Sequence, residues 1–538
     1  MLITARFSTG AVQNGRKREL RLKKQTFIQG AIILLAAGII NRLLGFIPRI
    51  ALPRIIGAEG VGLYQQGYPF FIVLVTLITG GIPLAVAKLV AEAESAGMPD
   101  RSKRILNISL RFTLSFGMLM LLLCLVFGSW ITTHILTDNR VYYTFVSMSP
   151  MLVIIAVSSV YRGYFQGKQN MIPSAASSVA ESLIRIFCVI WFSYLLLPKG
   201  LAFGAAGAML GTMVGELAGM VVLLWQYNRH HHRSQADTPA IDEEASPSPI
   251  FRPLMKLSIP VTASRLVGSF SYLLESIVLM RCLAFAGVAT VVATSQYGAL
   301  QGMIIPILLL PGALTTSLAV SLVPSLSEAA AQGNISTIHK RLHQAIRLSL
   351  VAGAPFAVIM YVLAEPLCML LYKQTDIAAM LKVMAPFALF IYIQSPLQAA
   401  LQALDRPGQA LINTAVGAAV KIGLIVLLAT NPDFGIYGAV MAICINSAAV
   451  TIMHAHSVRR LLQFRIQLQD VSKTAAGMII MAAGLTFLYQ RLPFEEVIWL
   501  QFMTSSALGM LLYLLIMTLC RMIRWKNLHR FPILRRWL

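Results

Sequence analysis

Charged residues are scarce in this sequence. Only 12% of its 538 residues are Asp, Glu, Lys or Arg, whereas 57% are hydrophobic. An ordinary soluble domain has about 25% charged residues, and a disordered chain has few apolar ones. The composition excludes both classes and indicates a polytopic membrane protein.

Acidic residues are the scarcest charged type, with 21 Asp and Glu against 44 Lys and Arg and a formal net charge of +23. In a soluble chain this excess would suggest nucleic-acid binding. Here most basic residues lie between apolar runs on one predicted side of the membrane, so topology and anionic lipid headgroups account for the charge. We expect no nucleic-acid partner.

Cysteine pairs and enzyme motifs are also missing. The six cysteines stand singly in or beside apolar runs without a CxxC pair, so the sequence predicts no disulfide framework and no zinc site. The chain has no Walker loop, no HExxH motif and no nucleophile elbow. We expect neither catalysis, nor a cofactor, nor a bound metal.

Long apolar runs dominate what is present. A helix needs about 20 apolar residues to cross a bilayer, and about fourteen such segments can be placed. They lie near 26–47, 67–90, 105–129, 141–165, 174–197, 204–226, 256–280, 294–322, 346–371, 379–403, 409–430, 435–457, 472–490 and 497–520. The predicted fold class is an all-α polytopic membrane protein.

An even number of crossings places both termini on one side, and both termini are rich in Lys and Arg, so the positive-inside rule predicts that both are cytoplasmic. No cleavable signal peptide is evident. The predicted organisation is a basic N-terminus (1–25), a first lobe of six helices (26–227), a cytoplasmic linker (228–252), a second lobe of six helices (253–460), two further helices (461–520) and a basic C-terminus (521–538).

The linker is predicted from its polar, Ser- and Pro-containing composition after Asn228. It contains His230-His231-His232, which could bind a metal, although a solvated loop run is the favoured interpretation.

The two blocks of six helices resemble each other. Arg42-Leu43-Leu44-Gly45 recurs as Arg265-Leu266-Val267-Gly268, Arg185 corresponds to Lys421, and Gly204–Ala208 recurs as Gly435–Ala439. Two copies with an even number of helices share one topology, and transporter halves of this kind hold substrate between them and rock around it. The repeat predicts a central cavity.

The stretch from Asn41 to Tyr64 is the strongest candidate site. Arg42 and Arg49 lie seven residues apart around the small Gly45, so a helix would bring both to nearly one face. Arginine at membrane depth usually faces a polar interior, and two guanidinium groups suit a phosphate. The alternatives are an ion pair with Glu275 or snorkelling to the interface. Pro48 and Pro53 are predicted to distort or end the helix, and the glycine-rich stretch after them is predicted to turn the chain back into the membrane.

Further ionisable residues lie inside predicted helices. Arg265, Arg185 and Lys421 are basic, and Glu181, Glu216 and Glu275 could line the cavity or couple an ion. Glu181 and Arg185 stand four residues apart and could neutralise each other.

Gly207, Gly211, Gly215 and Gly219 predict a surface for close helix approach, and prolines in the second block predict kinks.

Several motifs carry a resemblance to a known family. They are Asn41–Tyr64, Arg162–Gly167 with Asn170–Ala175, Glu181–Arg185, Gly81–Lys88 and Gln402–Pro407. In these motifs the chain resembles the stage V sporulation protein B and polysaccharide transporter group of the multidrug/oligosaccharidyl-lipid/polysaccharide flippase superfamily, which also contains MATE-like and MurJ-like proteins.

The resemblance implies export of an undecaprenyl-pyrophosphate-linked cell-wall precursor, lipid II-like or polysaccharide, by alternating access in the bacterial plasma membrane, in spore cortex peptidoglycan synthesis. It also implies cavity arginines at Arg42, Arg49 and Arg54. Expected partners are the lipid-linked substrate, membrane lipids and cell-wall synthesis enzymes. The alternatives are a cation-coupled multidrug exporter of the MATE type and a non-transporting membrane scaffold for wall synthesis.

Overall fold

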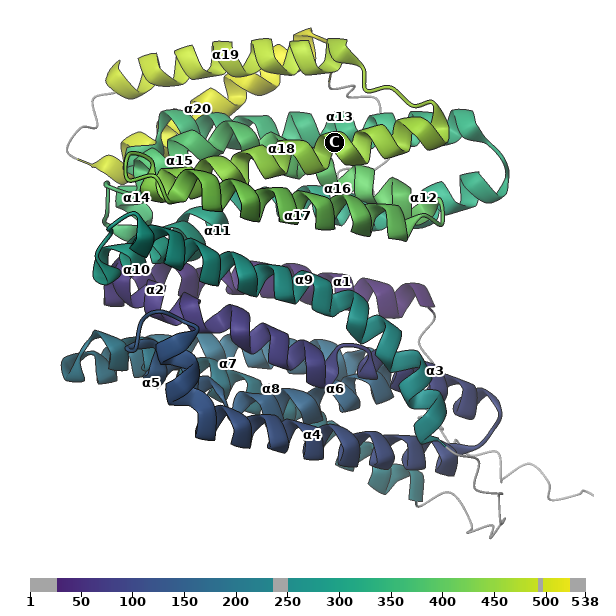
Figure 1. Cartoon of the computed structure of the whole chain (residues 1–538). Helices are drawn as coiled ribbons and strands as arrows, with labels where there is room; N and C mark the ends of the chain where they lie inside the picture. Colours follow the sequence, from purple (N-terminus) through teal and green to yellow (C-terminus); the bar gives the residue numbers. More distant parts are fainter. Residues whose placement is uncertain (1–26, 236–249, 492–496, 523–538) are drawn as a thin grey trace, which may run out of the picture.

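The computed structural model describes residues 27–235, 250–491 and 497–522, which form helices and connecting turns without any β-strand (Figure 1). This confirms the predicted all-α fold class. The helices are α1 Phe27–Leu44, α2 Phe46–Thr79, α3 Ile82–Ser95, α4 Pro99–His134, α5 Val141–Met148, α6 Met151–Gly167, α7 Ile172–Leu196, α8 Leu201–Gln235, α9 Phe251–Phe285, α10 Thr290–Gly298, α11 Ile305–Leu309, α12 Gly312–Ala331, α13 Ile335–Val362, α14 Ala364–Tyr372, α15 Ala378–Met384, α16 Ala388–Ala403, α17 Pro407–Ala429, α18 Gly435–Leu462, α19 Leu468–Arg491 and α20 Ile498–Leu519.

Thirteen segments of the described residues are long and apolar enough to cross a bilayer. The first, Ala36–Ser95, has 60 residues, and as a helix it would be about 90 Å long, roughly three times the hydrocarbon thickness. Its backbone leaves helical geometry at Gly57 (φ 66°, ψ −179°), a left-handed conformation that glycine adopts readily. Dividing the segment there gives two crossings and the predicted total of about fourteen.

The predicted boundaries of the first two helices are wrong. The helix is interrupted at Gly45, continues through Pro48 and Pro53, and leaves helical geometry at Gly57, the first of the glycines predicted to turn the chain. Pro48 falls in the first turn of α2, where no amide N–H is needed. Gly62 was expected in a turn but lies inside α2, where an added Cβ would come within 2.0 Å of the Thr294 carbonyl oxygen. The glycine permits close contact between α2 and α10.

The predicted linker also begins too early, because α8 continues through Gln235 and includes His230–His232. Residues 236–249 and the predicted basic N-terminus lie outside the described residues, as does the C-terminal tail beyond Met522.

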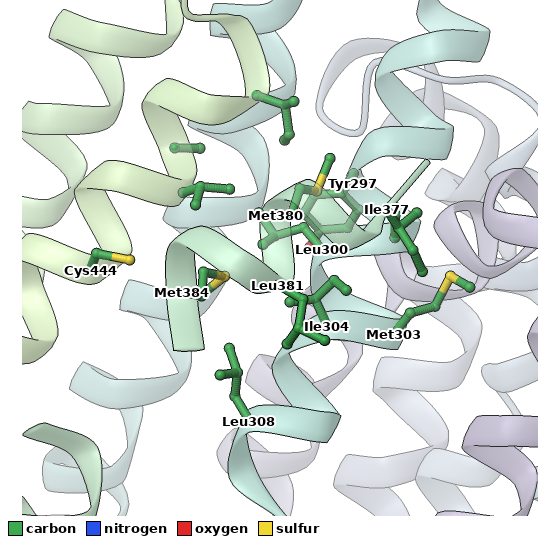
Figure 2. Close-up of a cluster of buried hydrophobic side chains, with 14 of the residues drawn as sticks. Tyr297, Leu300, Met303, Ile304, Leu308, Ile377, Met380, Leu381, Met384 and Cys444 are labelled. Atoms are coloured by element: carbon green, nitrogen blue, oxygen red, sulfur yellow. The ribbon is translucent and has the colours of Figure 1, made fainter. Parts of the chain in front are cut away.

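The helix predicted over 294–322 is interrupted. α10 leads into a π-helical turn at Ala299–Ile304, which is followed by α11 and α12. Leu300, Met303 and Ile304 of this turn are fully buried and lie near Leu381 of α15 in the core shown in Figure 2. π-Helical turns often occur at functional sites, and this one carries Gln301. The helix predicted over 346–371 is likewise divided into α13 and α14.

The helices pack in two groups with α9 and α1 between them (Figure 1). One buried cluster draws on α2 and α4 to α8, and another on α12, α13, α16 and α18. The last two helices, α19 and α20, pack against α13 at one edge.

The predicted glycine surface of α8 is confirmed. An added Cβ at Gly207 would lie 2.4 Å from the Phe192 carbonyl oxygen, and one at Gly211 would lie 2.3 Å from the Val189 amide nitrogen. Gly438, the repeat counterpart of Gly207, makes the same kind of contact with Leu428 of α17, at 2.6 Å. The hairpins α7–α8 and α17–α18 therefore close through equivalent glycines.

Gly211→Leu is expected to lower the thermal unfolding midpoint strongly. The new side chain would overlap the α7 backbone, which cannot move aside as a flexible side chain would, and overpacking typically costs about 1–3 kcal/mol or more. The measurement is fluorescence-detected size exclusion after heating in detergent. Gly423→Leu in α17 is the control, since nothing lies within 4 Å of a Cβ at Gly423. Equal midpoints for the two variants would contradict the packing role of Gly211.

Candidate functional site

A buried ion pair joins α9 to α17. Lys421 Nζ lies 2.5 Å from Glu275 Oε2, and the two side chains are 15% and 7% exposed. The other Glu275 oxygen accepts a hydrogen bond of 3.4 Å from the Gln301 amide. The structure thus pairs Glu275 with Lys421. The alternative that Glu275 pairs with Arg42 or Arg49 is wrong.

A second buried cluster joins α6, α7 and α8. Glu181 accepts hydrogen bonds from Arg185 at 2.9 Å and from Arg162 at 2.8 Å, one on each carboxylate oxygen. The pairing of Glu181 with Arg185 was predicted and is confirmed. Glu216 of α8 lies within hydrogen-bonding reach of the Glu181 carboxyl.

The Arg49 side chain is exposed, and within the described part of the chain it forms no hydrogen bond or ion pair. Its guanidinium is within electrostatic range of Tyr68 in α2, Tyr272 in α9 and Tyr372 in α14. Tyr68 is also within range of Arg185, and Tyr272 of Glu275. Electrostatic interactions therefore link a row of polar groups from one cluster to the other. We call this row the charged belt: Glu216, Glu181, Arg185, Tyr68, Arg49, Tyr272, Glu275 and Lys421.

Arg42 connects α1 to α12. Its Nη1 donates to Thr316 Oγ1 at 2.7 Å and to the Ala313 carbonyl at 3.4 Å. The preceding Asn41 donates to Ser178 of α7 at 2.7 Å. α1 therefore contacts the first group of helices through Asn41 and the second through Arg42.

Arg54 and Arg265 differ in how they are engaged. Arg54 donates to the carbonyls of Leu370 and Leu371, at 2.7 Å for the latter. These belong to the last turn of α14, where carbonyls lack helical partners and the helix dipole favours a cation. The exposed Arg265 side chain has no hydrogen bond or ion pair among the described residues.

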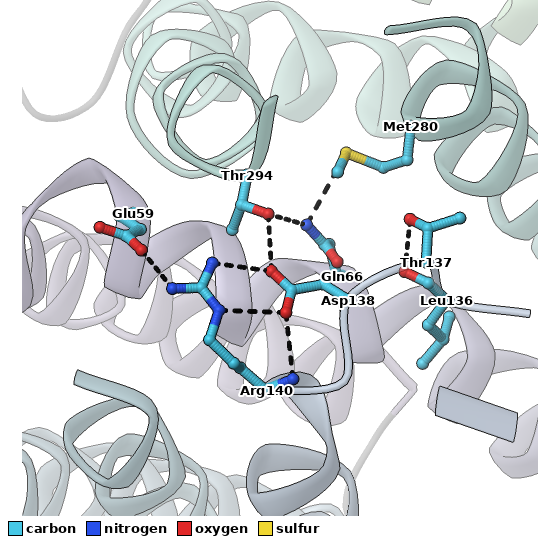
Figure 3. Close-up of polar contacts among 8 residues, drawn as sticks. All are labelled: Glu59, Gln66, Leu136, Thr137, Asp138, Arg140, Met280 and Thr294. Atoms are coloured by element: carbon cyan, nitrogen blue, oxygen red, sulfur yellow. Dashed lines mark hydrogen bonds and ion pairs between the residues drawn. The ribbon is translucent and has the colours of Figure 1, made fainter. Parts of the chain in front are cut away.

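A further polar network, shown in Figure 3, joins the α4–α5 loop to α2 and α10. Arg140 pairs with Asp138 at 2.9 Å and with Glu59 at 2.5 Å. Asp138 accepts a hydrogen bond from Thr294 at 3.0 Å, and Gln66 donates to Thr294 at 2.9 Å. Burial opposes ionisation of Asp138, but the hydrogen bonds and charge of Arg140 outweigh it and hold the pKa of that carboxyl below its ordinary value.

Asp138→Asn is expected to lower the thermal midpoint near neutral pH. A carboxyl with a depressed folded-state pKa stabilises the fold above its unfolded pKa of about 3.9, and this contribution is lost as the pH falls through the folded value. The gap in midpoint between wild type and Asp138→Asn should therefore stay constant from about pH 8 to 5 and narrow as the pH falls below the unfolded pKa of about 3.9. The exposed Asp433→Asn is the control, and a gap that widens on acidification would contradict the assignment.

Sequence reasoning missed this network and the role of Arg162. Arg162 was noted only within a motif, and Asp138 and Arg140 lie in a short loop without periodicity. The one available signal was two opposite charges spaced two residues apart.

Two pockets occur among the described residues, and neither is lined by a residue of the charged belt. An apolar pocket of about 440 Å³ separates Leu44 and Ile47 from Phe187 and Trp191 of α7. A polar pocket of about 370 Å³ lies among α13, Lys382 of α15 and the end of α19. None of the predicted site residues lines either pocket.

Buried ion pairs and an unpaired arginine within membrane-spanning helices define a multi-pass membrane protein with a polar interior, an arrangement typical of transporters. Residues 27–330 match the family described as "Polysaccharide biosynthesis protein", and residues 269–427 match the family "MatE". The chain belongs to the polysaccharide biosynthesis protein family, which confirms the predicted resemblance.

Named relatives agree with this placement. The chain is 40% identical to stage V sporulation protein B of Bacillus subtilis (strain 168), over 96% of this chain and 99% of that protein. It is 23% identical to lipid II flippase MurJ of the same organism, over 74% of this chain and 76% of that protein. A solved structure titled "Lipid II flippase MurJ, inward closed conformation" superposes with a TM-score of 0.69 at 16% identity, covering 93% of this chain and 100% of the other. The last likeness shows a shared fold.

Proposed function

We propose that this chain is a flippase that moves an undecaprenyl-pyrophosphate-linked cell-wall precursor, lipid II-like or polysaccharide, across the bacterial plasma membrane. It acts by alternating access in spore cortex peptidoglycan synthesis, with both termini in the cytoplasm. The names of the relatives support this proposal, since one is a sporulation protein and another a lipid II flippase.

The observation that carries the proposal is the unpaired Arg49 guanidinium in the middle of the charged belt. Placing an arginine in a membrane interior is costly, and an anionic ligand would offset that cost. A guanidinium binds phosphate oxygens through two parallel hydrogen bonds. In our proposal Arg49 and Arg265 hold the pyrophosphate, while Arg42 and Arg54 exchange their contacts with α12 and α14 for the ligand as the two lobes rock.

The alternative of a cation-coupled multidrug exporter has support from the MatE match. A site for cationic drugs needs a free carboxylate, however, and here Glu275 is occupied by Lys421 while Glu181 is occupied by two arginines. The remaining carboxyl of the belt, Glu216, contacts Glu181 and lies within electrostatic range of the same two arginines. The belt therefore favours an anionic substrate over a cationic one. A scaffold that recruits cell-wall synthesis enzymes would not need an unpaired arginine at membrane depth.

Native mass spectrometry of the purified protein tests these functions against each other. The protein is offered lipid II, an undecaprenyl-pyrophosphate-linked polysaccharide precursor and the cationic dye ethidium. Binding of a pyrophosphate lipid without ethidium supports the flippase and identifies the lipid class. Binding of ethidium alone would overturn it in favour of the exporter, and binding of none of the three would favour the scaffold.

A further inference from the structure

The packing of α7 on α8 forces two carboxyl groups together inside the membrane. An added Cβ at Gly215 would lie 2.5 Å from the Arg185 Cβ, and one at Gly219 would lie 3.1 Å from the Glu181 Cβ. Glu216 stands between these glycines on α8. Because the helices approach so closely, the Glu216 carboxyl reaches the Glu181 carboxyl.

Only one of the two carboxyls has cations of its own. Glu181 uses one oxygen for Arg185 and the other for Arg162, and its side chain is 10% exposed. Glu216 forms no ion pair with a basic residue of the described chain. Two carboxylates in hydrogen-bonding contact away from water repel each other and do not both ionise readily, whereas a proton held between them removes the repulsion and makes a hydrogen bond.

The charge of the cluster depends on that proton. With both carboxyls ionised, the two arginines and two glutamates sum to zero. With one proton bound, the cluster carries one net positive charge. Tyr68 connects this cluster to Arg49, because Tyr68 is within electrostatic range of Arg185, Glu216 and Arg49.

We propose that Glu216 and Glu181 form a proton-binding site that controls anion binding at Arg49. A proton on Glu216 leaves the cluster positive and strengthens attraction for a pyrophosphate in the charged belt, and loss of the proton weakens it. By linkage, a bound anion favours uptake of the proton to the same degree. This inference rests on the proposed function and adds a proton that is bound and released together with the lipid-linked anion.

The charged and titratable groups that face Glu216 come from three neighbouring helices. α6 contributes Arg162, α7 contributes Glu181 and Arg185, and α2 contributes Tyr68 with Arg49 behind it. α5 packs near the other end of α8, where Tyr143 contacts Phe203. Among these groups, Glu216 is the acid without a cation of its own.

The first test is infrared difference spectroscopy of the reconstituted full-length protein between about pH 5 and 9. Wild type should show a protonated-carboxyl band that titrates, and Glu216→Gln should lack it. Glu365→Gln is the matched control because Glu365 is exposed and pairs with Lys382, away from the belt. It should keep the band. A band that persists in Glu216→Gln would overturn the site.

The second test measures binding of undecaprenyl pyrophosphate against pH for wild type, Glu216→Gln and Glu365→Gln. The ligand titrates equally in all three, so a difference in slope reports the protein's own proton. Wild type should lose up to about tenfold more affinity per pH unit than Glu216→Gln, the limit for one linked proton. Equal slopes would overturn the coupling. Absence of binding at every pH in all three proteins would instead overturn the proposed function, with the infrared result unaffected.

Should Glu216→Gln fail to fold, Glu216→Asp keeps the proposal testable. The shorter side chain withdraws its carboxyl from Glu181, so the pH at which binding falls should shift from that of wild type. An unshifted midpoint in a folded Glu216→Asp protein would contradict the shared proton.

Discussion

Arg49→Ala is expected to weaken binding of undecaprenyl-pyrophosphate lipids by about 150-fold or more and to abolish their transport. Among the described residues the Arg49 guanidinium has no hydrogen-bond or ion-pair partner, so its removal costs the fold little, whereas the ligand loses a pair of charge-assisted hydrogen bonds. Such bonds contribute about 1.5–3 kcal/mol each. Native mass spectrometry measures the affinity, and accessibility of a labelled lipid precursor in proteoliposomes measures the transport.

Arg49→Lys and Arg104→Ala are the controls. Lysine keeps the charge but not the planar fork, so Arg49→Lys should recover part of the affinity. Arg104 is exposed in α4 and forms no ion pair among the described residues, so Arg104→Ala removes the same charge elsewhere and should bind normally. Equal affinities for wild type and a folded Arg49→Ala protein would remove Arg49 from the site.

Lys421→Ala is expected to destabilise the protein by about 3–5 kcal/mol, because it leaves the buried Glu275 carboxylate without a counter-charge. Glu275→Ala should cost a similar amount by leaving the Lys421 ammonium unpaired. Thermal unfolding in detergent, followed by static light scattering, reports both losses. The double variant Glu275→Leu/Lys421→Met removes both charges and should unfold much closer to wild type than either single variant.

Lys382→Ala provides the comparison for an exposed pair. Lys382 and Glu365 lie 2.6 Å apart, but their side chains are 41% and 62% exposed, so the loss should be about 0–1 kcal/mol. If Lys421→Ala cost no more than Lys382→Ala, burial of the Glu275 pair would not contribute to stability.

The sequence predicted the class of fold well because apolar length is a local property. Each run of about 20 apolar residues predicts a crossing without reference to any other, and the glycines of α8 reveal their packing role by spacing alone. The ion pair between Glu181 and Arg185 was predictable for the same reason, since both residues stand on one helix turn.

What escaped prediction depends on contacts between distant segments. Gly60 and Gly62 resemble a turn in the sequence, and only the proximity of Thr294 shows that Gly62 serves helix packing. Proline at residue 48 looks like a helix end unless the position of the first turn is known.

Ion pairs between residues on different helices could not be predicted from sequence spacing either. The residue four positions before Lys421 is a glycine, so no acid stands one helical turn away. The partner of Lys421 is Glu275 of α9, more than a hundred residues earlier in the chain. The roles of Arg42, Arg49, Arg54 and Arg265 as ligands of a substrate stay predictions.

The equivalent contacts of Gly207 and Gly438 have a consequence for the history of the chain. A duplicated ancestral unit would pass the same glycine to both copies, and the backbone contact is present in each. The charges beside those contacts diverged, since Arg185 finds its acid on its own helix while Lys421 finds it on α9. Related sequences should therefore keep glycine at both Gly207 and Gly438. The residues at Arg185 and Lys421 should vary independently of each other.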